Sequence, residues 1–201
     1  MSDLYNVTAS PHIRSKASTS RIMLYVIIAL LPATVFGIFN FGPRALAVIV
    51  VTIASCLVSE WIFNKITHKK QTIGDLSCIV TGLLLALNLS HTIPFWIAIV
   101  GGGFAIIVVK MLFGGLGQNF MNPALGARCF LLLAFTGPMT SFTFDGVTGP
   151  TPLAIIKENG QLYSDSMAMF TGRIAGTIGE TSVIALLIGA IFLIAMGVID
   201  L

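Results

Sequence analysis

Long apolar stretches separated by short polar segments dominate the pattern of side chains along this chain. A helix needs about 20 apolar residues to cross the roughly 30 Å hydrocarbon layer of a bilayer. The first two stretches and the last one approach that length. The pattern predicts an all-α integral membrane protein with about six transmembrane or half-membrane helices. The apolar stretches cover residues 22–41, 45–63, 76–89, 93–109, 124–135 and 181–199.

The middle stretches depart from simple full-length spans. Residues 76–89 and 124–135 are short, and residues 93–109 contain the triplet Gly101, Gly102, Gly103. Short or interrupted helices occur where backbone lines a site near the middle of the membrane. Glycines also allow two helices to pack closely. Both interpretations of these stretches stay open.

Composition and charge support a membrane location. Hydrophobic side chains make up 56% of the chain and charged ones 9%, whereas soluble domains carry about 25% charged residues. The mean hydropathy of +0.96 agrees, so an ordinary soluble globular protein is excluded. The net charge of +3 does not favour a nucleic-acid partner. Lys and Arg gather before residue 22 and at 65–70, which predicts a cytoplasmic N-terminus. The distribution of Lys and Arg does not decide whether residues 76–89 cross the membrane or enter it and return to the same side.

The pattern divides the chain into segments with different expected roles. A connection as long as residues 137–180 in so compact a chain is more often functional than passive. The segments are a cytoplasmic N-terminal segment at 1–21, membrane helices one to five at 22–136, the long loop at 137–180 and the last membrane helix at 181–201.

A glycine-rich motif, GGLGQNFMNPA, covers residues 114–124. Its glycines permit tight turns with positive φ. Asn122 is a favourable N-cap residue and Pro123 a favourable first helical residue. The motif therefore predicts either a capped start of a short helix or a loop that lines a ligand.

A proline-rich motif, DGVTGPTPLA, covers residues 145–154 in the long loop. Thr151 lies between Pro150 and Pro152, and proline fixes φ and favours an extended conformation in the residue before it. We expect an exposed, extended segment that presents a hydroxyl, although proline-rich turns are also common. The three histidines lie elsewhere in the sequence, so no nucleophilic triad accompanies Thr151 and no catalytic residue is assigned.

A third motif, GTIGETS, covers residues 176–182 before the last apolar stretch. Glu180 is placed to interact with the dipole of the helix that follows. Together with Glu60, Asp75 and Lys110 it is one of few ionisable groups near membrane depth. Such groups are candidates for an ion path, or they cap and snorkel at the interface. The three cysteines are widely spaced, so no metal site is expected.

Four motifs in order resemble the D subunit of the Rnf complex, the ion-translocating ferredoxin:NAD oxidoreductase. This family is similar to the B subunit of the sodium-translocating NADH:quinone reductase. The resemblance runs from about residue 10 to the end of the chain, and the ordered set is more specific than any one motif. The motifs are SPHI with STS (10–13 and 18–20), GGLGQNFMNPALGARCFLL (114–132), DGVTGPTPLA (145–154) and GTIGETS (176–182).

The resemblance implies a covalent flavin. The family carries FMN as a phosphoester on the last threonine of a Ser/Thr-Gly-Ala-Thr motif, attached by a separate flavin transferase. Here that motif reads Thr148-Gly149-Pro150-Thr151, with proline in place of alanine, so FMN is expected on Thr151. The family holds this flavin on the extracytoplasmic side. Residues 137–180 are therefore expected to form an extracytoplasmic flavin-bearing loop, with 76–89 spanning the membrane.

The function implied by the resemblance is that of a membrane subunit of a redox-driven ion pump. Its FMN would relay electrons between partner subunits, so the chain is an electron-transfer subunit rather than an enzyme on its own. Expected partners are the membrane and peripheral subunits of an Rnf-type complex, a flavin transferase and the lipid of the cell inner (cytoplasmic) membrane. The alternatives are a channel or small-solute transporter, or a scaffold without a cofactor. Family members are about half as long again, so a C-terminal truncation is also expected.

Overall fold

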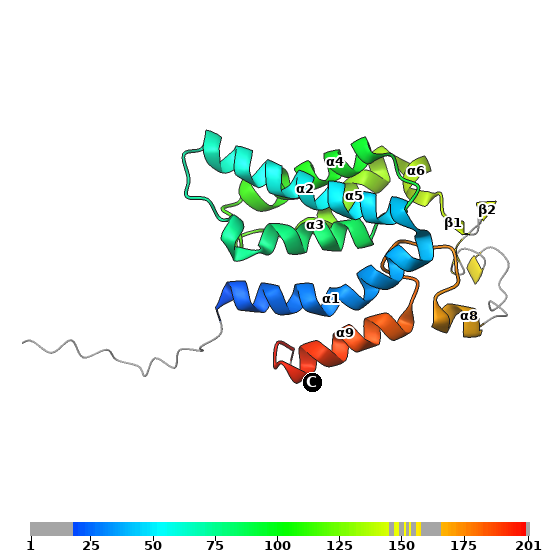
Figure 1. Cartoon of the computed structure of the whole chain (residues 1–201). Coiled ribbons are helices and arrows are strands. Elements are labelled where there is room, and N and C mark those ends of the chain that lie inside the picture. Colours follow the sequence, from blue (N-terminus) through cyan, green and yellow to red (C-terminus); the bar gives the residue numbers. More distant parts are fainter. Residues whose placement is uncertain are drawn as a thin grey trace, which may run out of the picture.

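The computed structural model describes residues 18–144, 147–148, 151, 153, 156–157 and 166–199. The predicted N-terminal segment therefore lies almost wholly outside the described residues, as does Pro150 of the flavin motif. The described elements are mostly helical (Figure 1). They are α1 (Thr19–Phe41), α2 (Pro43–Ile66), η1 (Ile73–Asp75), α3 (Ser77–Leu87), α4 (Phe95–Gly103), η2 (Phe104–Met111), α5 (Pro123–Ala134), α6 (Thr136–Thr140), β1 (Thr143–Phe144), β2 (Val147–Thr148), α8 (Ser166–Thr171) and α9 (Val183–Ala195).

The first two helices are long and apolar, and a tight turn joins them. Among the described helices, α1 and α2 are long and apolar enough to cross a membrane. The side chain of Ser18 caps α1 by accepting a hydrogen bond from the backbone of Arg21. Gly42 ends α1 with φ +76°, a conformation that costs glycine little, and Pro43 begins α2 at once. The remaining apolar helices, α3, α4 with η2, α5 and α9, are shorter.

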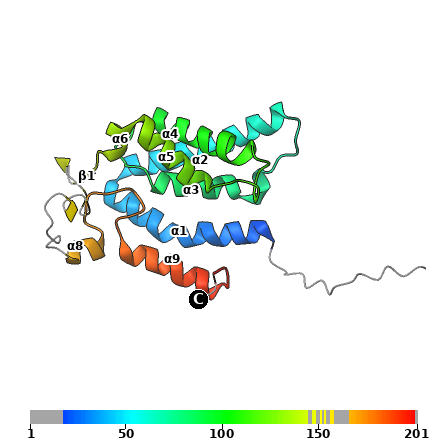
Figure 2. The same cartoon turned by 180° about the vertical axis from the view of Figure 1, so that it is seen from behind.

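The helices form a bundle with an added layer. Figures 1 and 2 both show α2, α3, α4 and α5 grouped together, with α1 on one side of them and α9 beyond α1. Gly189 of α9 lies so close to α1 that an added Cβ would overlap the carbonyl oxygen of Ala29. The main core contains buried aliphatic side chains such as Val48, Leu85 and Leu131. A short antiparallel pairing of β1 with β2 lies at one end of the bundle.

The predicted helix at residues 93–109 changes geometry after its glycines. It is α-helical through Gly103 and continues as the π-helix η2. An added Cβ on Gly101 would lie 2.6 Å from Leu131 Cδ1, and one on Gly102 would lie 2.7 Å from Ser55 Oγ. These glycines therefore allow α5 and α2 to pack closely against α4. This supports the packing interpretation of the triplet over a site lined by backbone.

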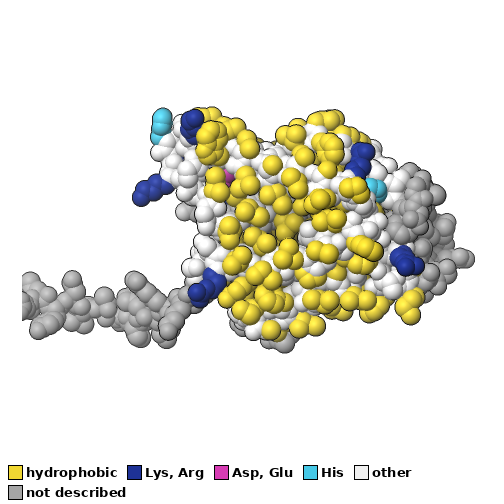
Figure 3. All heavy atoms as spheres, in the orientation of Figure 1, with side chains coloured by type: hydrophobic (Ala, Val, Ile, Leu, Met, Phe, Trp, Pro, Cys, Tyr) yellow, Lys and Arg dark blue, Asp and Glu magenta, His cyan; other side chains and the backbone are white. Residues whose placement is uncertain are grey.

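The surface of the bundle carries an apolar belt. Figure 3 shows hydrophobic side chains over the middle of this face and Lys and Arg side chains towards its two ends. Phe39 is 90% exposed and Leu133 is 84% exposed, which in water would be unfavourable. An apolar middle with charged ends is the surface expected of a protein embedded in a bilayer.

Candidate functional site

Thr151 lies in a cavity at the end of the bundle where α9 begins. The half-buried Thr151 lines a cavity of about 350 Å³ together with residues from α5, α8 and the segment before α9. Its polar lining includes Arg128, Glu180 and Thr181, and its apolar lining includes Phe142, Leu153, Met169, Ile174 and Val183. A cavity of this size with apolar walls and a few polar groups is typical of a small-molecule site.

A neutral partner holds Arg128 at this cavity. Arg128, on α5, donates a hydrogen bond from Nη1 to Oδ1 of Asn88 at the C-terminal end of α3. The Asn88 amide is itself oriented, because its Nδ2 donates to the carbonyl of Leu84 at 2.8 Å. Within the described part of the chain no carboxylate lies within ion-pair distance of Arg128. Its positive charge is therefore not neutralised there, and further N–H donors remain for a ligand.

The GTIGETS motif forms one wall of the cavity and is anchored on α3. Ile178 donates its backbone N–H to the carbonyl of Leu89 at 3.0 Å, and Gly179 donates to that of Leu87 at 2.9 Å. Ile178 is buried, and an added Cβ on Gly179 would lie 2.6 Å from Leu87 Cβ. The glycine therefore permits this close approach. Glu180 Oε2 accepts a hydrogen bond from Thr177 at 3.0 Å.

Thr181 contributes a buried hydroxyl that has no partner among the described residues. Thr181 is 1% exposed, and its Oγ1 forms no hydrogen bond there. Burying a hydroxyl without a hydrogen bond costs about 1–3 kcal/mol, so a ligand that accepted a hydrogen bond from Thr181 would be bound more favourably. A cavity with a guanidinium, two threonine hydroxyls and apolar walls fits a flavin, whose phosphate is anionic and whose ring is flat and largely apolar.

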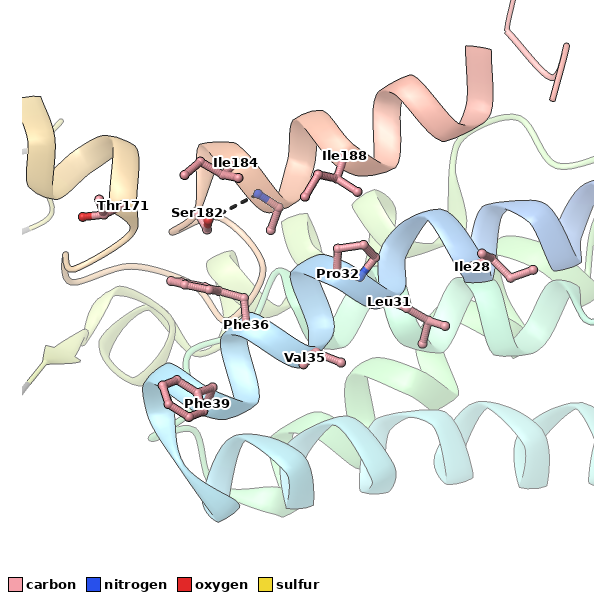
Figure 4. Close-up of a pocket in the computed structure, with 11 residues that line it drawn as sticks. Ile28, Leu31, Pro32, Val35, Phe36, Phe39, Thr171, Ser182, Ile184 and Ile188 are labelled. Carbon is pink, nitrogen blue, oxygen red and sulfur yellow. Dashed lines mark hydrogen bonds between the residues drawn. The ribbon is translucent and has the colours of Figure 1, made fainter. Parts of the chain in front are cut away.

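A larger cavity between α1 and α9 is lined mostly by hydrocarbon side chains. Figure 4 shows this groove, about 750 Å³ in volume, lined by Ile28, Leu31, Val35, Ile184 and Ile188 among others. The groove also contains two hydroxyls, but both are already bonded. Thr171 Oγ1 donates to the carbonyl of Met167 at 2.9 Å, and Ser182 Oγ accepts from the backbone of Ala185 at 3.3 Å. The lining of the groove is therefore almost entirely apolar, and each of its two hydroxyls already takes part in a hydrogen bond within the chain.

The glycine-rich motif leads into the start of α5, in agreement with the predicted capped helix start. Asn122 Oδ1 accepts hydrogen bonds from the backbone of Ala124 at 3.0 Å and Leu125 at 3.4 Å, and Pro123 is the first helical residue. The prediction of a capped helix start is confirmed. Residues of the motif also line two cavities of about 140 and 260 Å³ that share Lys110. The ligand-lining interpretation stays a prediction.

Three of the predicted ionisable residues meet in one buried network. Lys110 Nζ lies 2.7 Å from Glu60 Oε2 and donates to Ser77 Oγ at 2.6 Å. Ser77 in turn donates to Asp75, and Thr72 donates to the other Glu60 oxygen. The network lies near the C-terminal end of α2, and Figure 1 shows that end of α2 and α8 at opposite ends of the bundle. Glu180 belongs to that cavity instead.

The structure also reveals a cluster around a single histidine, His91, that sequence reasoning missed; we call it the histidine cluster. The ring of His91 stacks on Phe41 at 4.7 Å between centroids, and its Nε2 lies 3.5 Å from Thr143 Oγ1. Arg44 donates to the backbone carbonyls of His91 and Thr92, at 3.1 Å each. Burial lowers the pKa of His91, and the nearby positive charge of Arg44 adds to that shift. The sequence carries no local signal for this cluster, because its members come from separate segments.

Comparison with known proteins identifies the relatives of this chain. Residues 6–201 match a family described as NQR2, RnfD, RnfE. The D subunit of the Na(+)-translocating ferredoxin:NAD(+) oxidoreductase complex of Acetobacterium woodii is 49% identical over 202 residues, covering 96% of this chain and 63% of that protein. The D subunit of the proton-translocating ferredoxin:NAD(+) oxidoreductase complex of Clostridium ljungdahlii is 40% identical, covering 96% of this chain and 62% of that protein.

A more distant relative points to the same group. The D subunit of the ion-translocating oxidoreductase complex of Rhodobacter capsulatus is 32% identical, covering 95% of this chain and 63% of that protein. The chain thus spans less than two thirds of the length of these relatives. Because nearly all of its residues match, the chain belongs to the NQR2, RnfD, RnfE family and is similar to the D subunits of Rnf complexes.

Proposed function

We propose that this chain is a membrane subunit of a redox-driven ion pump and carries FMN as a phosphoester on Oγ1 of Thr151. One observation carries the flavin part of the proposal. Thr151 shares its cavity with the cation of Arg128 and with a buried Thr181 hydroxyl that has no partner among the described residues. The pump part is supported by the names of the relatives, which are subunits of ion-translocating ferredoxin:NAD or related oxidoreductase complexes.

The residues around Thr151 have defined roles in this proposal. FMN supplies one- and two-electron transfer when it is bound. Thr151 provides the attachment oxygen, and the tether keeps the cofactor at high local concentration beside the cavity. The apolar side chains of Phe142, Met169 and Ile174 would pack against the ring and exclude water.

The attachment step balances with a flavin dinucleotide as donor. Oγ1 of Thr151 forms a bond to the phosphorus of the FMN half, and the phosphoanhydride bond of the dinucleotide breaks. A nucleoside monophosphate leaves, and the hydroxyl proton of Thr151 passes to a base of the flavin transferase or to water. No electrons are exchanged in this step.

The proposed location and partners follow from the same proposal. The chain would lie in the inner (cytoplasmic) membrane with a cytoplasmic N-terminus, about six transmembrane or half-membrane helices and residues 137–180 on the extracytoplasmic side. It would exchange electrons with other membrane and peripheral subunits of an Rnf-type complex, and a flavin transferase would load it. The placement of Lys and Arg towards the ends of the bundle supports a transmembrane arrangement (Figure 3).

The test is covalent flavin fluorescence on a denaturing gel. The full chain is expressed with a flavin transferase, as are Thr151→Ala and the control Thr140→Ala, which removes an exposed hydroxyl outside the cavity. We expect a fluorescent band for the native chain and for Thr140→Ala, and none for Thr151→Ala. Fluorescence that survives Thr151→Ala would overturn the site. A native chain without fluorescence would favour the channel or transporter alternative.

A further inference from the structure

We propose that Arg128 is a positioning residue whose guanidinium binds the phosphoester on Thr151, with the hydroxyl of Thr181 as a second donor to the same phosphate. The proposal rests on the proposed function, because it concerns the same cavity. It assigns two residues that the flavin motif itself does not contain. Both lie outside residues 145–154, one on α5 and one in the turn before α9.

The position of Arg128 suits a phosphodiester. A phosphoester on Thr151 has its phosphorus one bond from Oγ1, and Thr151 and Arg128 line the same cavity. A phosphodiester carries one negative charge, and placing it beside apolar side chains is unfavourable without a counter-charge. Arginine is well suited here, because its planar fork binds two phosphate oxygens at once.

Among the described residues, no contact of Arg128 neutralises its charge. Its described hydrogen-bond partner is the neutral amide oxygen of Asn88, which orients the guanidinium without cancelling its charge. Glu180 lines the same cavity, but its Oε2 accepts a hydrogen bond from Thr177 at 3.0 Å, and no ion pair joins it to Arg128 within the described residues. The guanidinium of Arg128 is therefore held at the cavity without an anionic partner among the described side chains, so that an anionic ligand can pair with it.

Thr181 provides independent support. Thr181 lines the cavity, and its buried hydroxyl donates to no atom of the described chain. The neighbouring Ser182 differs, since its hydroxyl caps α9 through Ala185. A phosphate oxygen is a strong acceptor and would satisfy the Thr181 donor. The cation and the unpaired donor thus point to the same anionic ligand.

The experiment compares the rate of flavin attachment among variants of the full chain in membranes. Purified flavin transferase and flavin adenine dinucleotide are added, and covalent fluorescence is followed with time. We expect Arg128→Gln to attach flavin about tenfold more slowly, since it loses a charge-assisted hydrogen bond. Arg128→Lys should recover most of the rate because it restores the cation. The control Arg44→Gln removes an arginine that binds the carbonyls of His91 and Thr92 and should leave the rate unchanged.

A second readout separates phosphate contact from a structural role. In the flavin-loaded chains, the ³¹P resonance of the phosphoester should shift in Arg128→Lys and in Thr181→Val relative to the native chain. Thr181→Val removes a hydroxyl without a described partner, so it should not lower the unfolding temperature of the flavin-free chain. These two variants also keep the test valid if Arg128→Gln fails to fold.

The outcomes distinguish this inference from the proposed function. If Arg128→Gln attaches flavin at the native rate, or the ³¹P resonance is the same in all loaded variants, the assignment of Arg128 and Thr181 is wrong. The proposed function would still stand if Thr151→Ala abolishes attachment. If Thr151→Ala remains fluorescent, or the native chain takes up no flavin, the proposed function fails and this inference fails with it.

Discussion

Replacing Lys110 by methionine should strongly destabilise the protein. Lys110 is 2% exposed and Glu60 is 0% exposed, and they form an ion pair at 2.7 Å. Methionine is close in length to lysine but has no charge and no donor. The Lys110→Met variant therefore leaves the Glu60 carboxylate buried with Thr72 as its remaining described donor. Ser77 loses the ammonium that donates to it.

The magnitude follows from the burial of both partners. Removing one member of a buried ion pair costs about 3–5 kcal/mol, because an uncompensated charge remains. That is a large part of a total stability of about 5–15 kcal/mol. Adding Glu60→Gln to Lys110→Met removes the remaining charge and keeps a side chain that can accept from Thr72. We expect the double variant to recover most of the lost stability, with a coupling of about 2 kcal/mol or more.

The assay is thermal unfolding of the purified chain in detergent, followed by far-ultraviolet circular dichroism. The matched control is Lys65→Met, which removes a lysine that lies 4.7 Å from the ring centroid of Trp61 at the exposed end of α2. Its loss should cost about 1 kcal/mol or less. A Lys110→Met loss no larger than that of Lys65→Met would refute the reasoning. A double variant as unstable as the sum of its two single variants would refute it too.

Two further predictions concern the α1–α9 contact and the histidine cluster. Gly189→Val should lower the unfolding free energy by about 1–3 kcal/mol, because its Cβ would overlap the Ala29 carbonyl; Gly137→Ala, where nothing lies within 4 Å, is the control, and equal losses would contradict the prediction. The lowered pKa of His91 means that the unfolded chain binds its proton more readily, so stability should fall as the pH drops below about 6.5 and level off below the folded pKa. Unfolding midpoints measured from about pH 8 to about pH 5 should show a smaller decline for His91→Gln than for the native chain, and an unchanged decline would contradict the assignment.

Much of the helical structure was predictable because its signals are local. The apolar stretches 22–41 and 45–63 became α1 and α2 with ends shifted by a few residues. The start of α5 was predictable from Asn122 and Pro123, because capping uses neighbouring backbone groups. The change from α-helical to π-helical geometry at residues 103–104 was not predictable from the sequence. The glycines signalled close packing, but the π-helix depends on how η2 packs against α2 and α5.

The candidate site also contains one residue that the sequence suggested and others that only the structure brought to it. The family resemblance singles out Thr151 because its motif is contiguous in the sequence, and both the site and its FMN stay a proposal. Arg128 and Thr181 were not identifiable as its neighbours, since each reads locally as a helix residue or a turn residue. Their convergence depends on the docking of Ile178 and Gly179 on the end of α3.

The sequence by itself determined that the chain is an apolar helical protein of this family, where several helices start, and which threonine is the candidate for attachment. The helical character and the helix starts depend on residue composition and on interactions between near neighbours, whereas the family and the candidate threonine come from the resemblance of its motifs. The tertiary structure alone decided that Lys110 pairs with Glu60 and that Arg128 shares a cavity with Thr151. Such contacts join residues far apart in the chain, and the packing of whole helices, rather than any local pattern, brings them together.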